Sequence, residues 1–545
     1  MFLAALLAVD PPAVVHGQEK PTITVTRQVK HAIDARLFGQ FMERPSWSGE
    51  IGPEAALVPG THQLRPRAEE LIRQMRIPVL RFPGGTDVDY LDWTDMIDNA
   101  PGRKDPKRPI SKPRGNQISN GFGYDEFLRL CDRHGSEAIV VVNFRDGLLK
   151  VRKLEDAARH AARLVAYCNA PIDANLPEGL AEWAKLRAKN GHPKPYGVRY
   201  FQIGNETWFF RAHAMMIAPK DTNGYWFRCL KAYVDAMRSV DPSIQIIVDG
   251  YPIQVAAMTH KHLGDAIAYF AVHRYHPGPI RQVRRNGKPV DVSTLSPEDI
   301  WKGWAACPTT GPDGQALLVD HALHRARRLG YKIALTEWNW NGWWATRGYK
   351  LDSLQARGIG AASFLHAMLR NGDVIRMANQ SMLIGQGWPI NAIRVDPNDK
   401  VPGYMFPSGL VTTMYSQHHG DKLLAVDIKN MPTYEQPYQF AGLGPAKRVA
   451  TVDVLATRTQ DALFVHMVNR RFKDEQEVVI DLKAFTRVGP KGRLHILEGR
   501  INNEAAPGEP LAPAALRSKD FKLPSRRFGL RLGPRTVTFA EIPLK

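Results

Sequence analysis

Two glutamates stand directly after apolar stretches that have the composition of buried strands. Glu206 follows Tyr200-Phe-Gln-Ile-Gly-Asn205, and Glu337 follows Ile333-Ala-Leu-Thr336. Either residue alone could cap a strand end or pair with an arginine. Two carboxyl groups that face each other across a sugar ring can instead divide the work of breaking a glycosidic bond, because one protonates the leaving oxygen while the other attacks the anomeric carbon. We therefore interpret Glu206 and Glu337 together as a candidate catalytic pair.

The sequence around these glutamates alternates short apolar runs with longer amphipathic segments. We expect strands at 35–41, 78–82, 137–143, 198–203, 244–249, 268–273, 332–336 and 374–383. We expect helices between them at 62–76, 124–134, 154–168, 225–240, 316–329 and 353–371. Eight strands that alternate with helices predict a (β/α)8 barrel, also called a TIM barrel. Reactive side chains of such a barrel lie at the carboxyl ends of its strands, so the two glutamates would follow strands four and seven.

The pattern changes after about residue 420, where short alternating strands replace the strong helices. Strands are expected at 449–456, 462–469, 477–482 and 536–542, with proline and glycine between them. This pattern is typical of a β-sandwich, here jelly-roll-like. We predict a barrel over 33–420, a sandwich over 421–545, and an N-terminal strand within 19–32 that joins the sandwich. Residues 1–18 contain eight apolar residues directly after Met1, so we interpret them as a signal peptide of an exported, periplasmic or extracellular protein.

The composition limits the classes of binding partner but does not identify the substrate. Lysine and arginine number 73 against 54 aspartates and glutamates, a formal net charge of +19. The positive charge is scattered, and we interpret its densest stretch, 103–114, as a solvated loop. No zinc-finger spacing or RNA-binding signature is present, which argues against nucleic acid as a partner. No later segment is long and apolar enough for membrane insertion. The net positive charge is compatible with an acidic polysaccharide as substrate. An oligomer is possible.

The four cysteines give no reason to expect a metal site. Cys131, Cys168, Cys229 and Cys307 show no metal-ligand spacing. Cys131 and Cys168 fall in amphipathic helical stretches, where a cysteine usually packs as a small hydrophobic residue. Disulfides are not required by this arrangement. We expect neither a metal nor an organic cofactor.

An ordered set of motifs resembles glycoside hydrolase family 51, a family best known for α-L-arabinofuranosidases. The resemblance runs from about residue 35 to 385, and the C-terminal stretch Val465-His-Met-Val-Asn-Arg470 fits the same architecture. The motifs are Leu37-Phe-Gly-Gln-Phe-Met-Glu43, Arg81-Phe-Pro-Gly-Gly85, Asn120-Gly-Phe-Gly-Tyr-Asp-Glu-Phe127, Tyr167-Cys-Asn169, Leu186-Arg-Ala-Lys-Asn-Gly-His-Pro193, Gly204-Asn-Glu206 and Val272-His-Arg-Tyr275. Each motif alone is weak evidence, whereas their common order is strong evidence.

The resemblance implies a role for each candidate residue of the site. It makes Glu206 the acid/base and Glu337 the nucleophile of a retaining glycosidase. Asn205 would bind the 2-hydroxyl of the sugar, a contact that strengthens in the transition state. Glu43 would accept hydrogen bonds from sugar hydroxyls. The remaining three are His273 and Tyr275, expected beside the nucleophile, and Trp93, expected as an exposed indole on which a sugar face could stack.

One departure from the family pattern concerns the sugar that would be bound. After Arg81-Phe-Pro-Gly-Gly85 the family usually has asparagine, whereas this chain has Thr86 and then an acidic run, Asp87, Asp89 and Asp92. A threonine offers one hydroxyl where an amide offers both a donor and an acceptor. The aspartates could bind substrate hydroxyls, although turns and helix caps explain such residues more often. The stretch Gly385-Gln-Gly-Trp388 departs from the family as well.

Three functions therefore remain open. The first is an exo-acting α-L-arabinofuranosidase that works by double displacement on side chains of plant or algal polysaccharides. The second keeps this mechanism with another specificity, such as an endo-glucanase, a xylanase or a galactofuranosidase-like enzyme. The third is a carbohydrate-binding protein without catalysis, which would need no matched pair of glutamates. The partner in every case is an oligo- or polysaccharide.

Overall fold

A closed barrel of eight parallel strands forms the larger part of the molecule. The computed structural model describes residues 19–44, 50–100, 103, 120–177, 179–307, 320–344, 354–440, 442–500 and 511–545. The barrel strands follow the chain in order and close where the last pairs with the first, which confirms the predicted barrel. They are β2 (Gly39–Phe41), β3 (Val79–Phe82), β4 (Glu137–Val142), β5 (Tyr200–Ile203), β6 (Gln245–Asp249), β7 (Tyr269–Tyr275), β11 (Ile333–Asn339) and β13 (Ile375–Ser381).

The barrel interior changes from apolar to polar along its axis. One fully buried layer consists of Val79, Ile139, Tyr200, Ile247, Ala271, Ala334 and Met377. Side chains two positions further along a strand point to the same face. The next layer therefore places Arg81 above Val79, Gln202 above Tyr200 and His273 above Ala271. The apolar layer closes the barrel, and the polar layer lies toward the carboxyl ends of the strands.

The first expected strand is only half correct. Residues 35–38 form a 3₁₀-helical turn, η1 (Ala35–Phe38), and only Gly39–Phe41 is extended. The carboxylate of Asp34 caps this turn, because it accepts a hydrogen bond from the Arg36 N–H at 3.1 Å and pairs with its guanidinium group. A Cβ atom at Gly39 would lie 2.5 Å from Val79 Cγ1, so this strand passes its neighbour at a distance that only glycine allows.

Helices cover the barrel in the six segments that the sequence predicted and also in others that it did not, such as 253–263 and 407–417. They include α1 (Pro66–Met75), α2 (Tyr124–His134), α4 (Leu154–Asn169), α7 (Thr222–Arg238), α8 (Ile253–Leu263), α10 (Asp320–Leu329), α11 (Leu354–Arg370) and α12 (Pro407–Gln417). Helix α1 begins four residues later than expected, at Pro66, because proline is favoured in the first turn of a helix. The first part of the expected helix 316–329 lies outside the described residues. No helix that the structure describes is long and apolar enough to cross a membrane.

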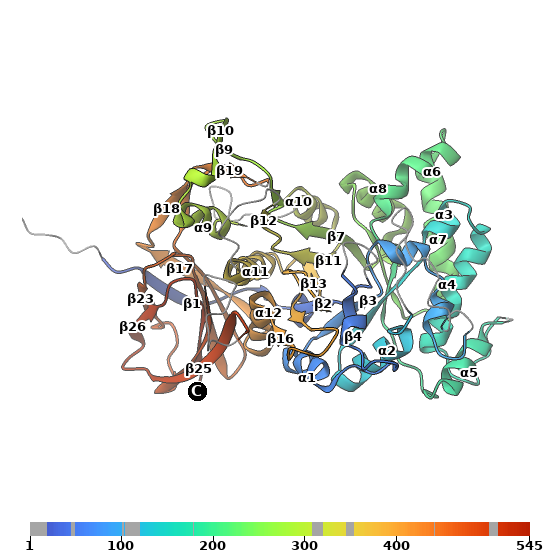
Figure 1. Cartoon of the computed structure of the whole chain (residues 1–545), viewed down its shortest axis with the longest axis horizontal. Coiled ribbons are helices and arrows are strands. Elements are labelled where there is room, and N and C mark those ends of the chain that lie inside the picture. The colour runs from blue at the N-terminus through green and yellow to red at the C-terminus, as the bar shows by residue number, and fades with distance from the viewer. Residues whose placement is uncertain are drawn as a thin grey trace, which may run out of the picture.

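The predicted β-rich C-terminal domain is present, and its main sheet is one continuous sheet of nine strands. Its order is β25-β24-β27-β22-β21-β17-β1-β23-β26. The strands are β1 (Thr22–Ala32), β17 (Lys422–Lys429), β21 (Val452–Arg458), β22 (Ala462–Asn469), β23 (Gln476–Asp481), β24 (Lys491–Gly499), β25 (Ala514–Lys522), β26 (Arg527–Leu532) and β27 (Val537–Pro543). Residues from both halves of the sheet meet in one apolar core, so the sheet curls around that core. Figure 1 shows β1, at the start of the chain, among the strands of this C-terminal region.

One predicted strand of this region is divided. The expected strand 449–456 consists of the end of β20 (Ala446–Ala450) and the beginning of β21, and the two are separated by Thr451. β20 leaves the main sheet and pairs with β18 (Thr433–Gln436). Helices α11 and α12 lie between the barrel and the curled sheet, since α12 contacts β24 and β25 while α11 contacts β21 and β22. The four cysteines are buried and unpaired.

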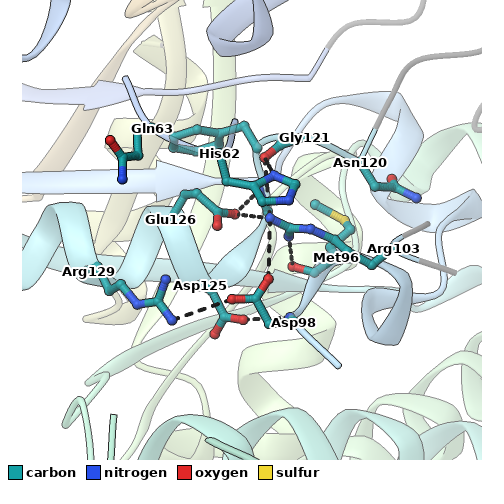
Figure 2. Close-up of polar contacts among 12 residues, drawn as sticks. His62, Gln63, Met96, Asp98, Arg103, Asn120, Gly121, Asp125, Glu126 and Arg129 are labelled. Atoms are coloured by element: carbon teal, nitrogen blue, oxygen red, sulfur yellow. Dashed lines mark hydrogen bonds and ion pairs between the residues drawn. The ribbon is translucent and has the colours of Figure 1, made fainter. Parts of the chain in front are cut away.

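The one described residue of the basic stretch 103–114 is not solvated. The Arg103 side chain is only 5% exposed and pairs with Glu126 at 2.7 Å. Its guanidinium group also donates to the backbone oxygens of Met96 at 3.0 Å and Gly121 at 3.3 Å (Figure 2). Arg103 therefore fastens the loop after β3 to the start of α2. The rest of the stretch lies outside the described residues.

Candidate active site

Glu206 and Glu337 lie together at the carboxyl ends of their strands, with His273 between them. His273 Nδ1 is 3.0 Å from Glu206 Oε1 and 3.5 Å from Glu337 Oε2. One oxygen of each carboxylate and one ring nitrogen of His273 all lie within 4.8 Å of one another. Glu337 is buried, whereas the side chain of Glu206 is 23% exposed. The fourth and seventh barrel strands thus bring one sheltered and one accessible carboxylate to the same place.

Two donors hold the carboxylate of Glu337 from different sides. Arg81, on β3, donates from Nη1 to Glu337 Oε1 at 2.9 Å. Tyr275, at the end of β7, donates its hydroxyl to Glu337 Oε2 at 2.8 Å and lies 2.6 Å from Ser381 Oγ. Arg81 is fully buried and its guanidinium carbon lies 4.5 Å from the centre of the Phe41 ring. The orientation of Glu337 is therefore fixed by side chains from two opposite walls of the barrel, β3 and β7.

His273 occupies the position expected of it and bonds on both ring nitrogens. Its Nε2 lies 3.0 Å from Thr336 Oγ1, while Nδ1 faces the two carboxylates. Burial lowers the pKa of His273, but the negative charges of Glu337 and Glu206 outweigh burial and raise the pKa above its ordinary value. Thr336 and Glu337 both reach the site because the pairing of β11 with β7 shifts register between Ala334 and Glu337.

Two buried aspartates hold the chain on either side of Glu206. The Asn205 N–H donates to Asp89 Oδ2 at 2.9 Å. The Thr207 N–H and hydroxyl both donate to Asp249 Oδ2, at 2.6 and 2.5 Å. Glu206 itself has φ 50° and ψ 39°, a left-handed conformation that a non-glycine residue adopts at a cost. The aspartates thus stabilise the backbone turn that presents the Glu206 carboxylate.

Burial raises the pKa of both aspartates. The pKa of Asp249 rises to about 6, although the hydrogen bonds from Thr207 and the charge of His273 oppose the rise. The pKa of Asp89 rises to about 7 against hydrogen bonds from three backbone N–H groups, including that of Phe144 at 2.7 Å. Both carboxylates accept backbone hydrogen bonds that hold the chain around Glu206. Asp92 is likewise structural, since it caps Thr94 and pairs with Arg152 at 2.8 Å.

Asn205 keeps part of its amide free. Its Oδ1 accepts a hydrogen bond from Arg81 Nη2 at 2.6 Å. Its Nδ2 is buried and has no hydrogen-bond partner among the described residues. A buried donor without a partner is costly unless a ligand supplies one. The side-chain amide of Asn205 is therefore available to a bound molecule.

Glu43 follows β2 and closely approaches Gly85, the residue before Thr86, after β3. A Cβ atom on Gly85, which has φ 66°, would lie 1.8 Å from Glu43 Oε1, so glycine is required for this approach. Glu43 is 7% exposed. Burial raises the pKa of Glu43 well above its ordinary value, and the charges of Glu337 and Asp87 raise it further. Thr86 is half-buried, and the described contacts include no hydrogen bond from its hydroxyl.

Trp93 does not form the exposed stacking surface that was expected. Its side chain is 6% exposed, and its indole N–H donates to the backbone oxygen of His160 at 3.1 Å. The ring packs against Trp183 with the ring centres 4.8 Å apart, and also against Tyr167. These contacts anchor the loop after β3, so the prediction of a sugar-stacking role for Trp93 is wrong.

The sequence analysis missed several polar residues of the site. Arg81 and Gln202 interrupt apolar strands, and Gln202 Oε1 accepts a hydrogen bond from Arg81 Nε at 2.9 Å. A charge within an otherwise apolar strand must be paired, and that rule would have assigned Arg81 to the site. Ser381 ends β13 and Thr336 lies in the middle of β11, and each is a polar residue in a largely apolar strand, which is a weaker signal of the same kind. No local pattern identified Asp249 as the partner of Thr207.

The stretch 385–388 is held in place by a buried glutamate. Glu50 accepts hydrogen bonds from the backbone N–H groups of Gln386 at 2.8 Å, Gly387 at 3.1 Å and Trp388 at 3.1 Å. These residues and Arg394 line a cavity of about 450 Å³ beside the end of β13. The departure from the family pattern in this stretch therefore coincides with a separate hollow.

Comparisons with known proteins agree with this geometry. The family model of the α-L-arabinofuranosidase 1 domain matches residues 71–284, and that of the α-L-arabinofuranosidase C-terminal domain matches residues 337–535. An intracellular exo-α-L-arabinofuranosidase of Bacteroides ovatus is 30% identical over 506 residues, which cover 88% of this chain and 86% of that protein. A probable α-L-arabinofuranosidase C of Aspergillus terreus is 29% identical over 238 residues, 43% of this chain. That match spans only 42% of the fungal protein.

Solved structures show the same fold. The α-L-arabinofuranosidase of Thermotoga maritima in its arabinose complex has a TM-score of 0.71 at 22% identity, with 96% of this chain and 100% of that chain covered. The GH51 α-L-arabinofuranosidase of Thermotoga petrophila gives a TM-score of 0.69 at 24% identity with the same coverage. The match to the Bacteroides ovatus protein extends over most of both chains. The chain therefore belongs to glycoside hydrolase family 51, the family of the α-L-arabinofuranosidases.

Proposed function

We propose that the chain is a retaining, exo-acting α-L-arabinofuranosidase that removes side chains from plant or algal polysaccharides by double displacement. The observation that carries the proposal is the closeness of the two carboxylates, whose nearest oxygens lie within 4.8 Å of each other. Carboxyl groups about 5–5.5 Å apart are typical of retaining enzymes, whereas inverting enzymes hold them about 6.5–9.5 Å apart to leave room for a water molecule. The short approach of the two carboxylates supports the retaining arrangement over the inverting one.

In the first step Glu337 attacks the anomeric carbon of the arabinofuranosyl unit. The bond from that carbon to the leaving oxygen breaks, and Glu206 transfers its proton to this oxygen. The product is a covalent glycosyl–enzyme with an ester to Glu337. Arg81 and Tyr275, which donate to the two oxygens of Glu337, orient the carboxylate for this attack. The greater exposure of Glu206 suits a group that must reach the leaving oxygen.

In the second step a water molecule replaces the leaving group. Glu206, now a carboxylate, takes a proton from the water as the water oxygen bonds to the anomeric carbon. The ester to Glu337 breaks, arabinose leaves with its original anomeric configuration, and Glu206 is protonated again. His273 lies against Glu206, and the raised pKa of its imidazole allows a positive charge beside the carboxylate in this state.

Three groups are placed to bind the sugar. The free Nδ2 of Asn205 can donate to the 2-hydroxyl, a hydrogen bond that strengthens as positive charge develops at the anomeric carbon. Glu43, with a raised pKa, can donate or accept from a sugar hydroxyl according to its protonation state. Thr86 directly follows Gly85, which approaches Glu43, so its hydroxyl could add a further hydrogen bond to the sugar.

The proposal is tested by initial rates on a panel of 4-nitrophenyl glycosides with wild type, Glu206→Ala and Glu337→Ala. Glu137→Ala is a matched control, because Glu137 begins β4 at the opposite end of the barrel. We expect cleavage of the α-L-arabinofuranoside, collapse of both site variants and an unaffected control. Added azide should give a glycosyl azide of retained configuration with Glu206→Ala and of inverted configuration with Glu337→Ala. An inverted arabinose from the wild type would contradict the double displacement.

The same panel separates the other specificities. Cleavage of a glucoside, xyloside or galactofuranoside in place of the arabinofuranoside would assign the same chemistry to a different sugar. Binding of a polysaccharide without turnover by the wild type would indicate a carbohydrate-binding protein. If the natural substrate is acidic, its affinity should fall steeply with added salt because surface charges are screened.

We also propose that the protein is exported. The apolar run directly after Met1 supports the proposal, although residues 1–18 lie outside the described part of the chain. Expression of the full chain should yield a secreted form that lacks these residues. N-terminal sequencing of that form is the measurement, and retention of an intact N-terminus in the cytoplasm would contradict the proposal.

A further inference from the structure

Two aromatic side chains next to Glu206 are exposed to solvent. Phe209 is 63% exposed and Tyr251 is 54% exposed. Among the phenylalanine, tyrosine and tryptophan side chains whose exposure the structure describes, only these two reach this value. Single exposed apolar residues need no explanation, whereas their concentration at one place marks a binding surface. Met215 and Met216 in the following helix, α6 (Arg211–Ile217), are 55% and 70% exposed.

The concentration is local. Ten large hydrophobic side chains of the described residues are exposed, and four of them fall between positions 209 and 251. The other six are scattered over the barrel helices, the loops and the curled sheet. The surface beside Glu206 therefore differs from the rest of the protein surface, because exposed apolar side chains placed at random would be spread over the whole chain.

Trp208 connects the two exposed rings to the catalytic pair. Its ring centre lies 5.5 Å from that of Tyr251, 5.8 Å from that of Phe209 and 5.5 Å from that of His273. His273 in turn is hydrogen-bonded to Glu206. The rings of Trp208, Phe209 and Tyr251, here named the aromatic ledge, therefore run without interruption from the site to the solvent.

The base of the aromatic ledge is rigid. Thr207, directly before Trp208, bonds twice to Asp249 Oδ2, and Asp249 lies two positions before Tyr251. The Phe209 N–H donates to the backbone oxygen of Glu206 at 3.0 Å. One carboxylate thus fixes the two loops that carry the ledge. A preformed surface costs less to bind to than one that must be ordered first.

The position of the ledge defines what it can touch. The acid/base must reach the leaving oxygen, so the leaving group lies on the side of Glu206, after β5 and β6. Two of the three groups proposed to bind the arabinosyl unit, Glu43 and Thr86, follow β2 and β3, which β4 separates from β5 and β6. A molecule bound in the site therefore directs its leaving group over the ledge.

We propose that the aromatic ledge is the leaving-group subsite and binds the apolar C–H face of a sugar ring in the polysaccharide from which the arabinosyl unit is cut. This inference rests on the proposed function and specifies its substrate: the arabinosyl unit is attached to a sugar chain rather than to a small alcohol. Flat aromatic rings offer large contact areas at little cost in conformational entropy, and the C–H faces of sugars pack on them.

The test compares two substrates that share the arabinosyl unit. Methyl α-L-arabinofuranoside has a leaving group too small to reach the ledge, whereas an arabinosylated xylo-oligosaccharide covers it. For Phe209→Ala and Tyr251→Ala we expect kcat/KM on the oligosaccharide to fall about tenfold each, mainly through KM. The same variants should keep kcat/KM on the methyl glycoside within about twofold. Ile428→Ala, an exposed apolar residue on β17, is the control and should change neither value.

The outcomes separate the two proposals. Suppose that the wild type cleaves both substrates. If the variants then lose kcat/KM equally on both, or lose none on the oligosaccharide, the subsite is overturned while the arabinofuranosidase proposal stands. A wild type inactive toward both arabinosides would overturn the proposed function, and the subsite with it. Thermal unfolding of each variant checks that the fold is intact, and both substitutions are at exposed positions where we expect little change.

Discussion

Two buried clusters of charged side chains in this chain combine the same residue types in opposite proportions. The site cluster consists of Glu43, Arg81, Glu206, His273 and Glu337. The interface cluster, between α11 and β21, consists of His366, Arg370, Asp453 and Arg470. The site cluster places three carboxyl groups around one arginine and one histidine. The interface cluster places two arginines and one histidine around a single carboxylate.

The proportions set the pKa of each group. Burial raises the pKa of Glu43, and the neighbouring negative charges raise it further. Burial would also raise the pKa of Asp453, but Arg370, His366 and Arg470 hold it well below its ordinary value. The two histidines differ in the same sense: the carboxylates raise the pKa of His273, whereas burial lowers that of His366 despite Asp453.

This difference is expected if the site cluster binds a substrate and the interface cluster joins two parts of the fold. The carboxylate of Asp453 is saturated with donors, as expected for a buried group whose task is structural. The site cluster keeps an excess of negative charge and leaves Asn205 Nδ2 without a partner. Such an arrangement lowers the stability of the empty site. The same negative charge would stabilise the positively charged transition state of a bound sugar.

The largest expected effect separates activity from stability at the site cluster. Glu337→Gln should lower kcat on 4-nitrophenyl α-L-arabinofuranoside on the order of 10⁴-fold or more, because an amide cannot form the covalent intermediate. The free energy of unfolding should change by less than about 1 kcal/mol, since the amide oxygen still accepts from Arg81 or Tyr275. Rates and urea unfolding of the same preparation measure both. A large loss of stability would show that Glu337 is a structural partner of Arg81.

The reverse behaviour is expected at the interface cluster. Asp453→Ala leaves Arg370 and Arg470 buried without their carboxylate, which should lower the free energy of unfolding by about 3–5 kcal/mol. The rate per folded molecule should stay unchanged, because Asp453 lies outside the barrel mouth. Asp427→Ala on exposed β17 is the control, with an expected change below about 0.5 kcal/mol. Lost activity in folded Asp453→Ala would mean that the two clusters are coupled.

A third effect tests the link between Asp249 and Glu206. Asp249→Ala removes the acceptor of both Thr207 hydrogen bonds, whereas Asp249→Asn keeps an oxygen there. Misplacing the acid should slow a substrate with a poor leaving group about 100-fold, and one with an activated phenol much less. The alanine variant should show this dependence on the leaving group and the asparagine variant should lack most of it. An equal loss on both substrates would indicate general damage to the fold.

A smaller effect concerns pH: the contributions of Glu43 and Asp453 to the free energy of unfolding should change with pH in opposite directions. Because the pKa of folded Glu43 is raised above 4.5, its contribution to stability is fully present below that value and is lost as pH rises through the folded pKa. Asp453 has a lowered pKa, so its contribution is present above 3.8 and is lost as pH falls through the folded pKa. The free energy of unfolding of Glu43→Gln should therefore rise relative to that of the wild type between pH 5 and 8. The stability deficit of Asp453→Asn relative to the wild type should shrink below pH 4.

Urea unfolding across pH 3–8 measures both differences against the wild type. The comparison fails if Glu43→Gln follows the wild-type curve throughout, because Glu43 would then ionise as freely in the folded chain as in the unfolded chain. It also fails if Asp453→Asn is as stable as the wild type at pH 7. Either result would show that the site cluster and the interface cluster do not differ in their charge as described above.

The sequence predicted the barrel and the meeting of Glu206 and Glu337 at its carboxyl end, because both depend on local patterns. Apolar runs of four to seven residues define the strands, and a glutamate directly after such a run must lie at the carboxyl end of the barrel. The 3₁₀-helical turn at 35–38 was missed because one capping side chain, Asp34, overrides the propensity of the residues that follow.

The rest of the site depends on partners that are distant in the chain. Trp93 is buried by Trp183 and Tyr167, and nothing near position 93 shows that these rings meet it. The register shift in β11 that brings both Thr336 and Glu337 to the site is set by pairing with β7. Long-range packing and register are the properties that a periodic pattern does not specify.

The smallest expected effect concerns the residue that departs from the family pattern. Thr86→Asn places an amide beside Glu43 and adds a donor or an acceptor for a sugar hydroxyl, so KM for 4-nitrophenyl α-L-arabinofuranoside should fall about two- to fivefold with kcat nearly unchanged. Thr86→Val removes the hydroxyl at nearly constant volume and should raise KM by a similar factor. If the valine variant matches the wild type, the Thr86 hydroxyl does not touch the sugar. Sugar selection would then lie with Glu43 and Asn205 rather than with this position.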